Sequence, residues 1–118
     1  LRFPQLYRDL AKAGAVLCFV PSAFTVPTGK AHWEVLLRAR AIENGMWIIA
    51  AAQVGQHEDG RATWGHSMVV SPWGEIILDL SGEKPETRTV DIDLRQVEVS
   101  RGQIPSLKND RPYEISRK

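Results

Sequence analysis

The most regular pattern of hydrophobic and polar positions lies in residues 28–55, and it predicts a helix, a sharp stop and a buried strand. Apolar side chains recur there at helical spacing, at Trp33, Leu36, Leu37 and Ala41. Thr28 is a suitable N-cap, because its hydroxyl can accept a hydrogen bond from a free N–H of the first turn. Asn44 and Gly45 tolerate the left-handed conformation that ends a helix. The uncharged run at 46–52 then has the composition of a strand covered on both faces.

A second helix and strand precede this stretch. Apolar residues recur at helical spacing from Leu6 to Ala13, and Gly14 would close that helix. The apolar run at 15–20 (AVLCFV) predicts a strand that lies beside the later one, in the order typical of an α/β layer. The loop at 21–29 leaves this strand at its C-terminal end, the edge at which open α/β sheets bind ligands.

The second half of the chain has an antiparallel pattern. After a turn at 58–60, two short apolar runs at 66–71 and 75–80 are joined by Pro-Trp-Gly at 72–74, a hairpin signature. Residues 87–94 alternate between polar and apolar side chains, as a half-exposed strand does.

The C-terminal part predicts a short helix and a tail. The helix is expected within residues 94–104. The polar segment 105–118 predicts an extended tail that is either disordered or docked on another subunit.

Composition excludes several classes of protein. The chain has 118 residues, enough for one domain, and 15 Lys and Arg against 14 Asp and Glu give a net charge of +1. We therefore expect no nucleic-acid partner and no attraction to an anionic membrane, and the apolar runs fall short of the roughly 20 residues of a membrane span. A single cysteine, Cys18, excludes an internal disulfide framework and favours a reducing, cytoplasmic compartment.

Three blocks of the sequence resemble the C-terminal half of the nitrilase superfamily of carbon–nitrogen hydrolases, in its deaminated glutathione amidase-like branch. The blocks are LRFPQLYRDLAKAG, VPSAFTVPTGKAHWEVLLRARAIENGMWIIAAAQVG and WGHSMVVSPWGEII. The resemblance covers residues 1 to about 113. It implies an α/β (α+β) fold, half of an α-β-β-α sandwich, in a chain that forms the C-terminal part of a single hydrolase domain and works without a cofactor.

The resemblance also implies where the chemistry lies. Family members hydrolyse amides or nitriles through a cysteine thioester, with a glutamate as the proton acceptor and a lysine at the tetrahedral intermediate. Their nucleophilic cysteine directly precedes the segment matched here by Leu1 to Pro4, and the glutamate and lysine precede it further. We therefore expect this chain to be a fragment of a longer protein, without an initiator Met and with no catalytic residue of its own.

The thiol and the histidines of this chain have structural interpretations. Cys18 lies among apolar residues that raise the pKa of a thiol, so we interpret it as an inert core residue and not as the nucleophile. No cysteine or second histidine stands at ligand spacing from His32, His57 or His66, which argues against a metal site. His66 and the following serine are interpreted as framework.

The candidate substrate-binding residues are Arg2, Ser22, Ala23, Phe24 and Thr25. Arg2 follows the implied nucleophile by about one helical turn, where a guanidinium could bind a substrate carboxylate or, alternatively, bridge two structural layers. Residues 22–25 offer a hydroxyl, backbone groups and an aromatic wall at the ligand-binding edge, with plain loop packing as the alternative.

A candidate subunit interface lies on the helix at 31–44, which is apolar on more than one side. It consists of Trp33, Glu34, Arg38, Arg40 and Glu43 and predicts a homodimer or higher homo-oligomer. Glu34 could instead be a pocket carboxylate, but an ion pair with Arg38 four residues later is favoured.

Two functions remain open at this point. One is the amidase-type hydrolase, acting on a small-molecule amide or nitrile. The other is a non-catalytic αββα module, used for oligomerisation or binding. In family members two sheets pack face to face, and this chain holds roughly half of the strands. In both cases one sheet face of this chain would therefore need another chain to cover it.

Overall fold

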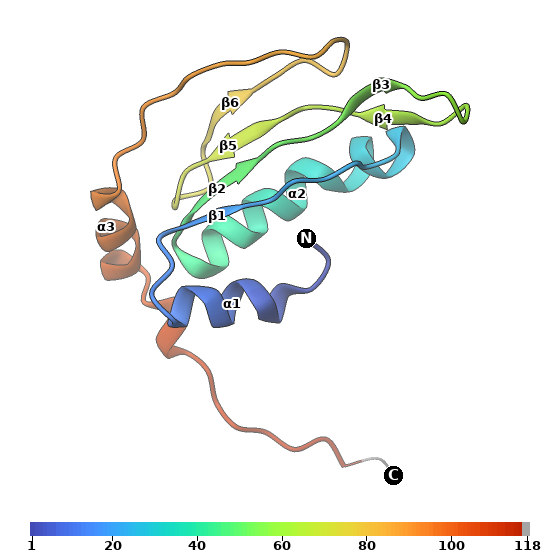
Figure 1. Cartoon of the computed structure of the whole chain (residues 1–118). Helices are drawn as coiled ribbons and strands as arrows, with labels where there is room; N and C mark the ends of the chain where they lie inside the picture. The colour runs from blue at the N-terminus through green and yellow to red at the C-terminus, as the bar shows by residue number, and fades with distance from the viewer. Residues whose placement is uncertain (117–118) are drawn as a thin grey trace.

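Helices and strands alternate in the first half of the chain, and short antiparallel strands follow in the second half. The computed structural model describes residues 1–116. The elements are α1 (Pro4–Lys12), β1 (Leu17–Phe19), α2 (Val26–Asn44), β2 (Trp47–Ala50), β3 (Val54–Gln56), β4 (Ala62–Trp64), β5 (Met68–Val70), β6 (Ile76–Asp79), α3 (Arg95–Gln103) and the 3-10 turn η1 (Ser106–Lys108). A four-stranded sheet has the order β1-β2-β5-β6, and β3 pairs with β4 in a separate ribbon (Figure 1).

The two predicted strand pairs are confirmed. β1 is parallel to β2, with Cys18 opposite Ile48, as expected for two strands that are joined by a helix. β5 and β6 form the predicted antiparallel hairpin, and Gly74 in its turn has the left-handed φ of 90° that a glycine adopts without steric cost.

Helix α2 begins earlier than predicted. Thr25 is its N-cap, with an extended backbone, and Pro27 lies in the first turn, so the expected N-cap at Thr28 is wrong. The Thr28 hydroxyl instead donates to the carbonyl of Thr25, at 3.2 Å, from inside the helix. The predicted end is confirmed, because Gly45 is left-handed with φ 53°.

The strand expected at 87–94 is wrong as a strand. Within residues 1–116 this segment joins no ladder. Its alternation nevertheless reflects its packing, because Val90 and Ile92 cover Trp47 and Val97 in a small apolar cluster. The short helix predicted at 94–104 is confirmed as α3.

The start of the C-terminal tail is held against helix α1 of the same chain. Asp110 accepts a hydrogen bond from Arg8 Nε at 2.7 Å and forms ion pairs with Arg8 and Lys12. These two cations lower the pKa of Asp110 to about 2. The prediction for 105–118 is a tail that is extended throughout, whereas residues 106–108 form η1. Beyond η1 the chain has no regular structure as far as residue 116, and its last two residues lie outside the described range. Docking of the tail on another subunit stays a prediction.

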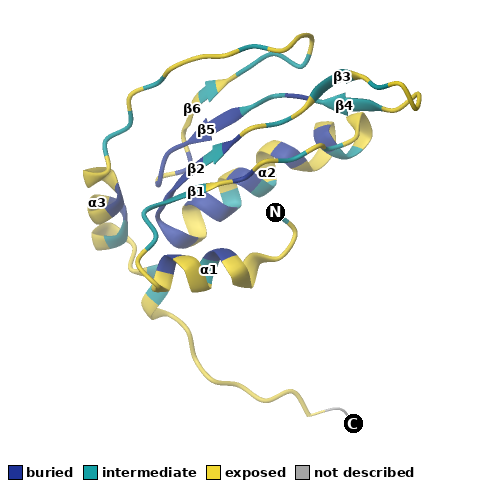
Figure 2. Cartoon of the chain, in the orientation of Figure 1, coloured by how far each residue is buried: buried dark blue, intermediate teal, exposed yellow. Residues whose placement is uncertain are grey.

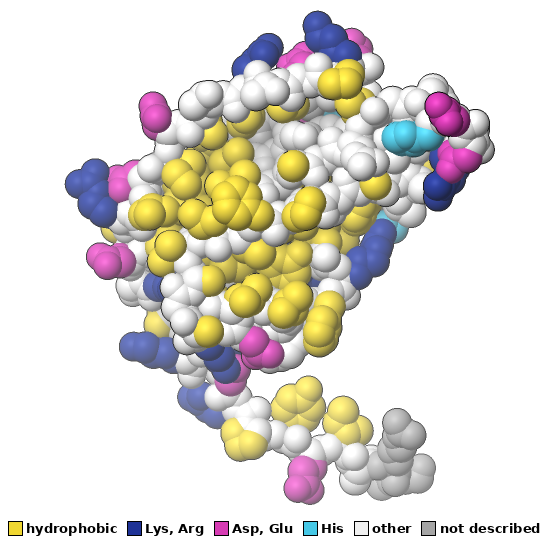
Figure 3. Space-filling model, viewed as in Figure 1, with side chains coloured by type: hydrophobic (Ala, Val, Ile, Leu, Met, Phe, Trp, Pro, Cys, Tyr) yellow, Lys and Arg dark blue, Asp and Glu magenta, His cyan; other side chains and the backbone are white. Residues whose placement is uncertain are grey.

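The main sheet is covered unequally on its two faces. One face packs on α2, where Trp33, Leu37 and Ala41 are buried, so the dark side of this helix in Figure 2 faces the strands. The opposite face is covered at one end by α3 and the segment around Val90. Hydrophobic side chains remain visible over the strands in Figure 3, and Phe19 of β1 is 68% exposed. The described chain therefore has an open apolar sheet face.

Candidate functional site

The candidate site lies at the loop after β1, which is hydrogen-bonded to the segment after β2 on one side and to β4 on the other. Ser22 N–H donates to the carbonyl of Ala51 at 2.9 Å, and Gln53 N–H donates back to the carbonyl of Ser22 at 3.0 Å. On its other side, the carbonyl of Phe24 accepts from Trp64 N–H at 2.9 Å. The loop 22–25 is thus held at the C-terminal ends of β1 and β2, the edge expected for a ligand site.

Arg2 and Phe24, two of the predicted substrate-binding residues, lie in contact. The Arg2 guanidinium carbon is 5.1 Å from the centroid of the Phe24 ring, within the range of a cation–π interaction. Arg2 Nη2 also lies 3.2 Å from His32 Nδ1 on α2. Among residues 1–116 no carboxylate forms an ion pair with Arg2. Its positive charge is therefore available to an anionic group at this edge.

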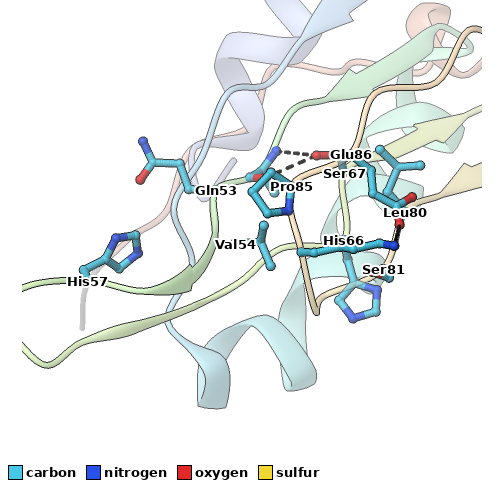
Figure 4. A pocket seen from close by; sticks show the side chains of 11 residues that line it. Gln53, Val54, His57, His66, Ser67, Leu80, Ser81, Pro85 and Glu86 are labelled. Carbon is cyan, nitrogen blue, oxygen red and sulfur yellow. Dashed lines mark hydrogen bonds and ion pairs between the residues drawn. The ribbon is translucent and has the colours of Figure 1, made fainter.

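Two cavities are lined by the loop, and a third adjoins them at Gln53. Ala23 and Thr25 line one of about 290 Å³, and Ser22 and Ala23 line another of about 560 Å³. A third, of about 460 Å³, has His57 and His66 at opposite ends and includes Ser67 and Glu86 (Figure 4). The predicted loop residues Ser22, Ala23 and Thr25 are thus cavity-lining.

Gln53 lines all three cavities, and it was not among the predicted site residues. Its side chain is exposed at the point where the apolar strand run ends. A polar residue directly after a buried strand, at the ligand-binding edge, was the available signal.

His66 has an unusual backbone conformation beside this site. It is the one non-glycine residue within 1–116 with a positive φ, 58°, which costs roughly 1–3 kcal/mol for such a residue. Its carbonyl accepts from the buried Trp33 Nε1 at 2.7 Å, and its ring stacks on Trp64 at 4.5 Å between centroids. Nδ1 lies 3.0 Å from the carboxylate of Asp79. Framework contacts of this kind agree with the structural interpretation of His66.

Cys18 has the properties expected of an inert thiol. It is half-buried and packs against the core beneath α2, and burial raises the pKa of its thiol. A thiol with a raised pKa is a poor nucleophile near neutral pH.

The described part of the chain contains neither a group of metal ligands nor a membrane-spanning helix. Among residues 1–116, no three His, Cys, Asp or Glu side chains are grouped so that they could hold a metal ion. None of the helices in that range is long and apolar enough to cross a membrane.

The candidate interface residues on α2 divide into buried and exposed ones. Trp33 and Arg40 are 1% and 5% exposed within this single chain, so neither presents a surface to a partner. Arg40 donates to the carbonyl of Leu1 at 3.1 Å and pairs with Glu43. Glu34 and Arg38 form the predicted ion pair, at 3.3 Å, on the exposed side of the helix. Their exposed neighbours on α2 are Val35 and Ile42, which the prediction of this interface did not include.

Comparison with known proteins identifies relatives over most of the chain. The family model described as carbon-nitrogen hydrolase matches residues 1–101. The deaminated glutathione amidase of Synechocystis sp. is 50% identical over 109 residues, which are 92% of this chain and 40% of the relative. The chain thus spans well under half the length of this curated relative.

Solved structures agree with the sequence matches. The NitFhit protein of C. elegans superposes with a TM-score of 0.82 at 47% identity, over 93% of this chain and 26% of that protein. A variant of the amidase from Nesterenkonia sp. AN1, with the acetamide moiety of fluoroacetamide added covalently at its active-site cysteine, superposes with a TM-score of 0.61 at 37% identity. That match covers 69% of this chain and 30% of the amidase. The mixed α/β fold is therefore that of part of a nitrilase-superfamily structure.

Proposed function

This chain belongs to the carbon–nitrogen hydrolase family, and from that premise we propose that it is the C-terminal part of a single amidase-type hydrolase domain. The whole protein would cleave a small-molecule amide, or a nitrile, through a cysteine thioester, and would do so in the cytoplasm without a cofactor. The observation that supports this best is the loop 22–25, which is held at the ligand-binding edge of the sheet with Arg2 stacked on it.

The proposed chemistry needs a nucleophile from outside residues 1–118. Its thiolate attacks the carbonyl carbon of the amide, and a glutamate takes the thiol proton and passes it to the leaving amine. A lysine stabilises the oxyanion of the tetrahedral intermediate. Water then hydrolyses the thioester, which releases the acid and restores the thiol. The modified active-site cysteine of the Nesterenkonia amidase supports, by analogy, a cysteine as the nucleophile.

The part of this chain in that reaction would be substrate binding. We propose that Arg2 binds a carboxylate of the substrate, since a guanidinium forms two parallel hydrogen bonds with such a group. Phe24 would hold the guanidinium in place from the other side. Ser22, Ala23 and Thr25 line the two cavities at the loop, Ala23 both of them. The preferred substrate class is thus a small amide that carries a carboxylate.

The test compares the 118-residue chain with the protein expressed at the full length of its gene. Ammonia release from carboxylate-bearing amides is expected from the gene-length protein, and none from the 118-residue chain. Cys18→Ala is the matched control, and it should leave the turnover of the gene-length protein within about twofold, because the thiol lies in the core. Turnover by the 118-residue chain that disappears in Cys18→Ala would refute the proposal. A gene-length protein with no activity would favour the non-catalytic module.

We further propose that two copies of the protein pair through the exposed side of α2. Val35 and Ile42 are 65% and 50% exposed there, and Arg38 lies between them. Each residue would act twice across a two-fold axis, so a single charge reversal changes the interface at two places.

Arg38→Glu is therefore expected to shift the gene-length protein toward the monomer, as measured by light scattering at a fixed concentration. The change should leave the core intact, because the Arg38 side chain is 48% exposed. His57→Glu, at the distant ribbon, is the control and should keep the parent mass. If Arg38→Glu kept the parent mass, α2 would not be the interface, and the open apolar sheet face would become the leading candidate.

A further inference from the structure

We infer that His66, held by Asp79, is a positioning residue for the loop 22–25. That His66 holds the loop does not depend on the proposed function; that the loop binds substrate rests on it. The inference starts from the contrast between the conformation of His66 and its surroundings. A histidine in the left-handed region persists only where its neighbours hold it, and here they hold both its backbone and its ring.

The backbone of His66 is fixed from the helix side. Its carbonyl accepts the indole N–H of Trp33, which is itself 1% exposed in the core. Gly65, just before it, is also left-handed, with φ 70°. These two residues turn the chain from the β3–β4 ribbon into β5 of the main sheet.

The ring of His66 is fixed from the strand side. Because an ionised carboxylate only accepts hydrogen bonds, Nδ1 carries the proton that is shared with Asp79 of β6, at 3.0 Å. The ring also stacks on Trp64, and Gly82 lies so close that a Cβ there would come within 2.9 Å of Nε2. Little freedom is left to the imidazole.

The residues on both sides of this turn carry the bonds that hold the loop. Trp64 N–H, two residues before His66, donates to the carbonyl of Phe24. Ser67 Oγ, directly after His66, accepts from Ala52 N–H at 2.9 Å, next to Gln53, whose N–H bonds Ser22. A change in the turn at His66 would therefore move both supports of the loop at once.

Hydrogen exchange on the gene-length protein tests this inference without any substrate. In Asp79→Ala and in His66→Gly, the amides of Ser22, Gln53 and Trp64 are expected to exchange about tenfold faster than in the parent. Glycine adopts the left-handed conformation freely, so His66→Gly removes the ring and leaves the backbone path available. Asp79→Asn keeps an acceptor oxygen for Nδ1–H and should restore the parent rates. Asp91→Ala, at an exposed carboxylate away from the turn, is the matched control.

The outcomes separate this inference from the proposed function. Parent exchange rates in Asp79→Ala, or an equal acceleration at Val20, whose N–H bonds the carbonyl of Ile49 in β2, would overturn the positioning role. Faster exchange together with a KM raised about tenfold and a kcat within about twofold would support both the positioning role and the substrate loop. Faster exchange with an unchanged KM would keep the positioning role and reject the loop as a substrate site. A gene-length protein without amide turnover would reject the proposed function, while the exchange rates still decide the role of His66.

Discussion

Replacing Gly29 by alanine is expected to lower the free energy of unfolding by about 3 kcal/mol, the upper end of the usual cost of overpacking. Gly29 is buried in the first turns of α2, against the side chain of Trp64. A Cβ at this position would overlap the Cβ and Cγ of that tryptophan and lie 2.6 Å from its Cδ1. The stem of Trp64 cannot move aside without shifting β4, so the helix and the ribbon would have to separate.

Gly102→Ala is the control for this prediction, because it makes the same change in another helix. A Cβ at Gly102 in α3 would meet no atom within 4 Å. The better helix propensity of alanine should therefore raise the free energy of unfolding by about 0.5–1 kcal/mol. Equilibrium urea denaturation of both variants measures the difference, and equal effects of the two changes would contradict the packing described for Gly29.

Truncating Trp33 to alanine is expected to lower the free energy of unfolding by about 4 kcal/mol. Its side chain is 1% exposed, and its ring centroid lies 5.0 Å from that of Phe24. The change would leave a large cavity between α2 and the sheet, and it would also leave the carbonyl of His66 without the indole donor. Trp33→Phe fills part of the space but still removes the donor, so its effect should be intermediate.

Trp73 provides the matched control, since it is the same residue type in the turn between β5 and β6. It is 51% exposed, and Trp73→Ala should cost less than about 1 kcal/mol by the same denaturation measurement. A similar loss of stability in both alanine variants would show that Trp33 does not anchor the core.

Local patterns in the sequence were enough to predict most helices and the main strand pairs. The end of α2 at Gly45 follows from the few residue types that adopt a left-handed conformation, and β1 and β2 follow from uncharged runs of strand length. The start of α2 was misplaced because Thr25 and Thr28 are equally good caps. Pro27, which is favoured in a first helical turn, distinguishes them.

Features that depend on distant partners could not be predicted in this way. The turn at 58–60 of the β3–β4 ribbon was predicted, but its strands are only three residues long, and their register, with Val54 opposite Trp64, is visible only in three dimensions. In residues 87–94, polar and apolar side chains alternate as in a strand, but in the described part of the chain the segment pairs with no other strand. The alternation arises because Val90 and Ile92 are packed against Trp47. In the candidate site, the loop 22–25 was located from its place after a strand, whereas the support from His66 arises from contacts with Trp33 and Asp79.

Salt is expected to act in opposite directions on two features of this chain, the open apolar sheet face and the ion pairs that hold the tail on α1. Sulfate and similar salts strengthen apolar burial, so they favour the covering of Phe19 and its neighbours. A net charge of +1 supplies little repulsion to oppose such contacts at any ionic strength. The bond of Asp110 to Arg8 and Lys12 lies at the surface, where the same ions screen it. Concentrated salt thus weakens the ion pairs between the tail and α1, while it favours any contact that covers the apolar sheet face.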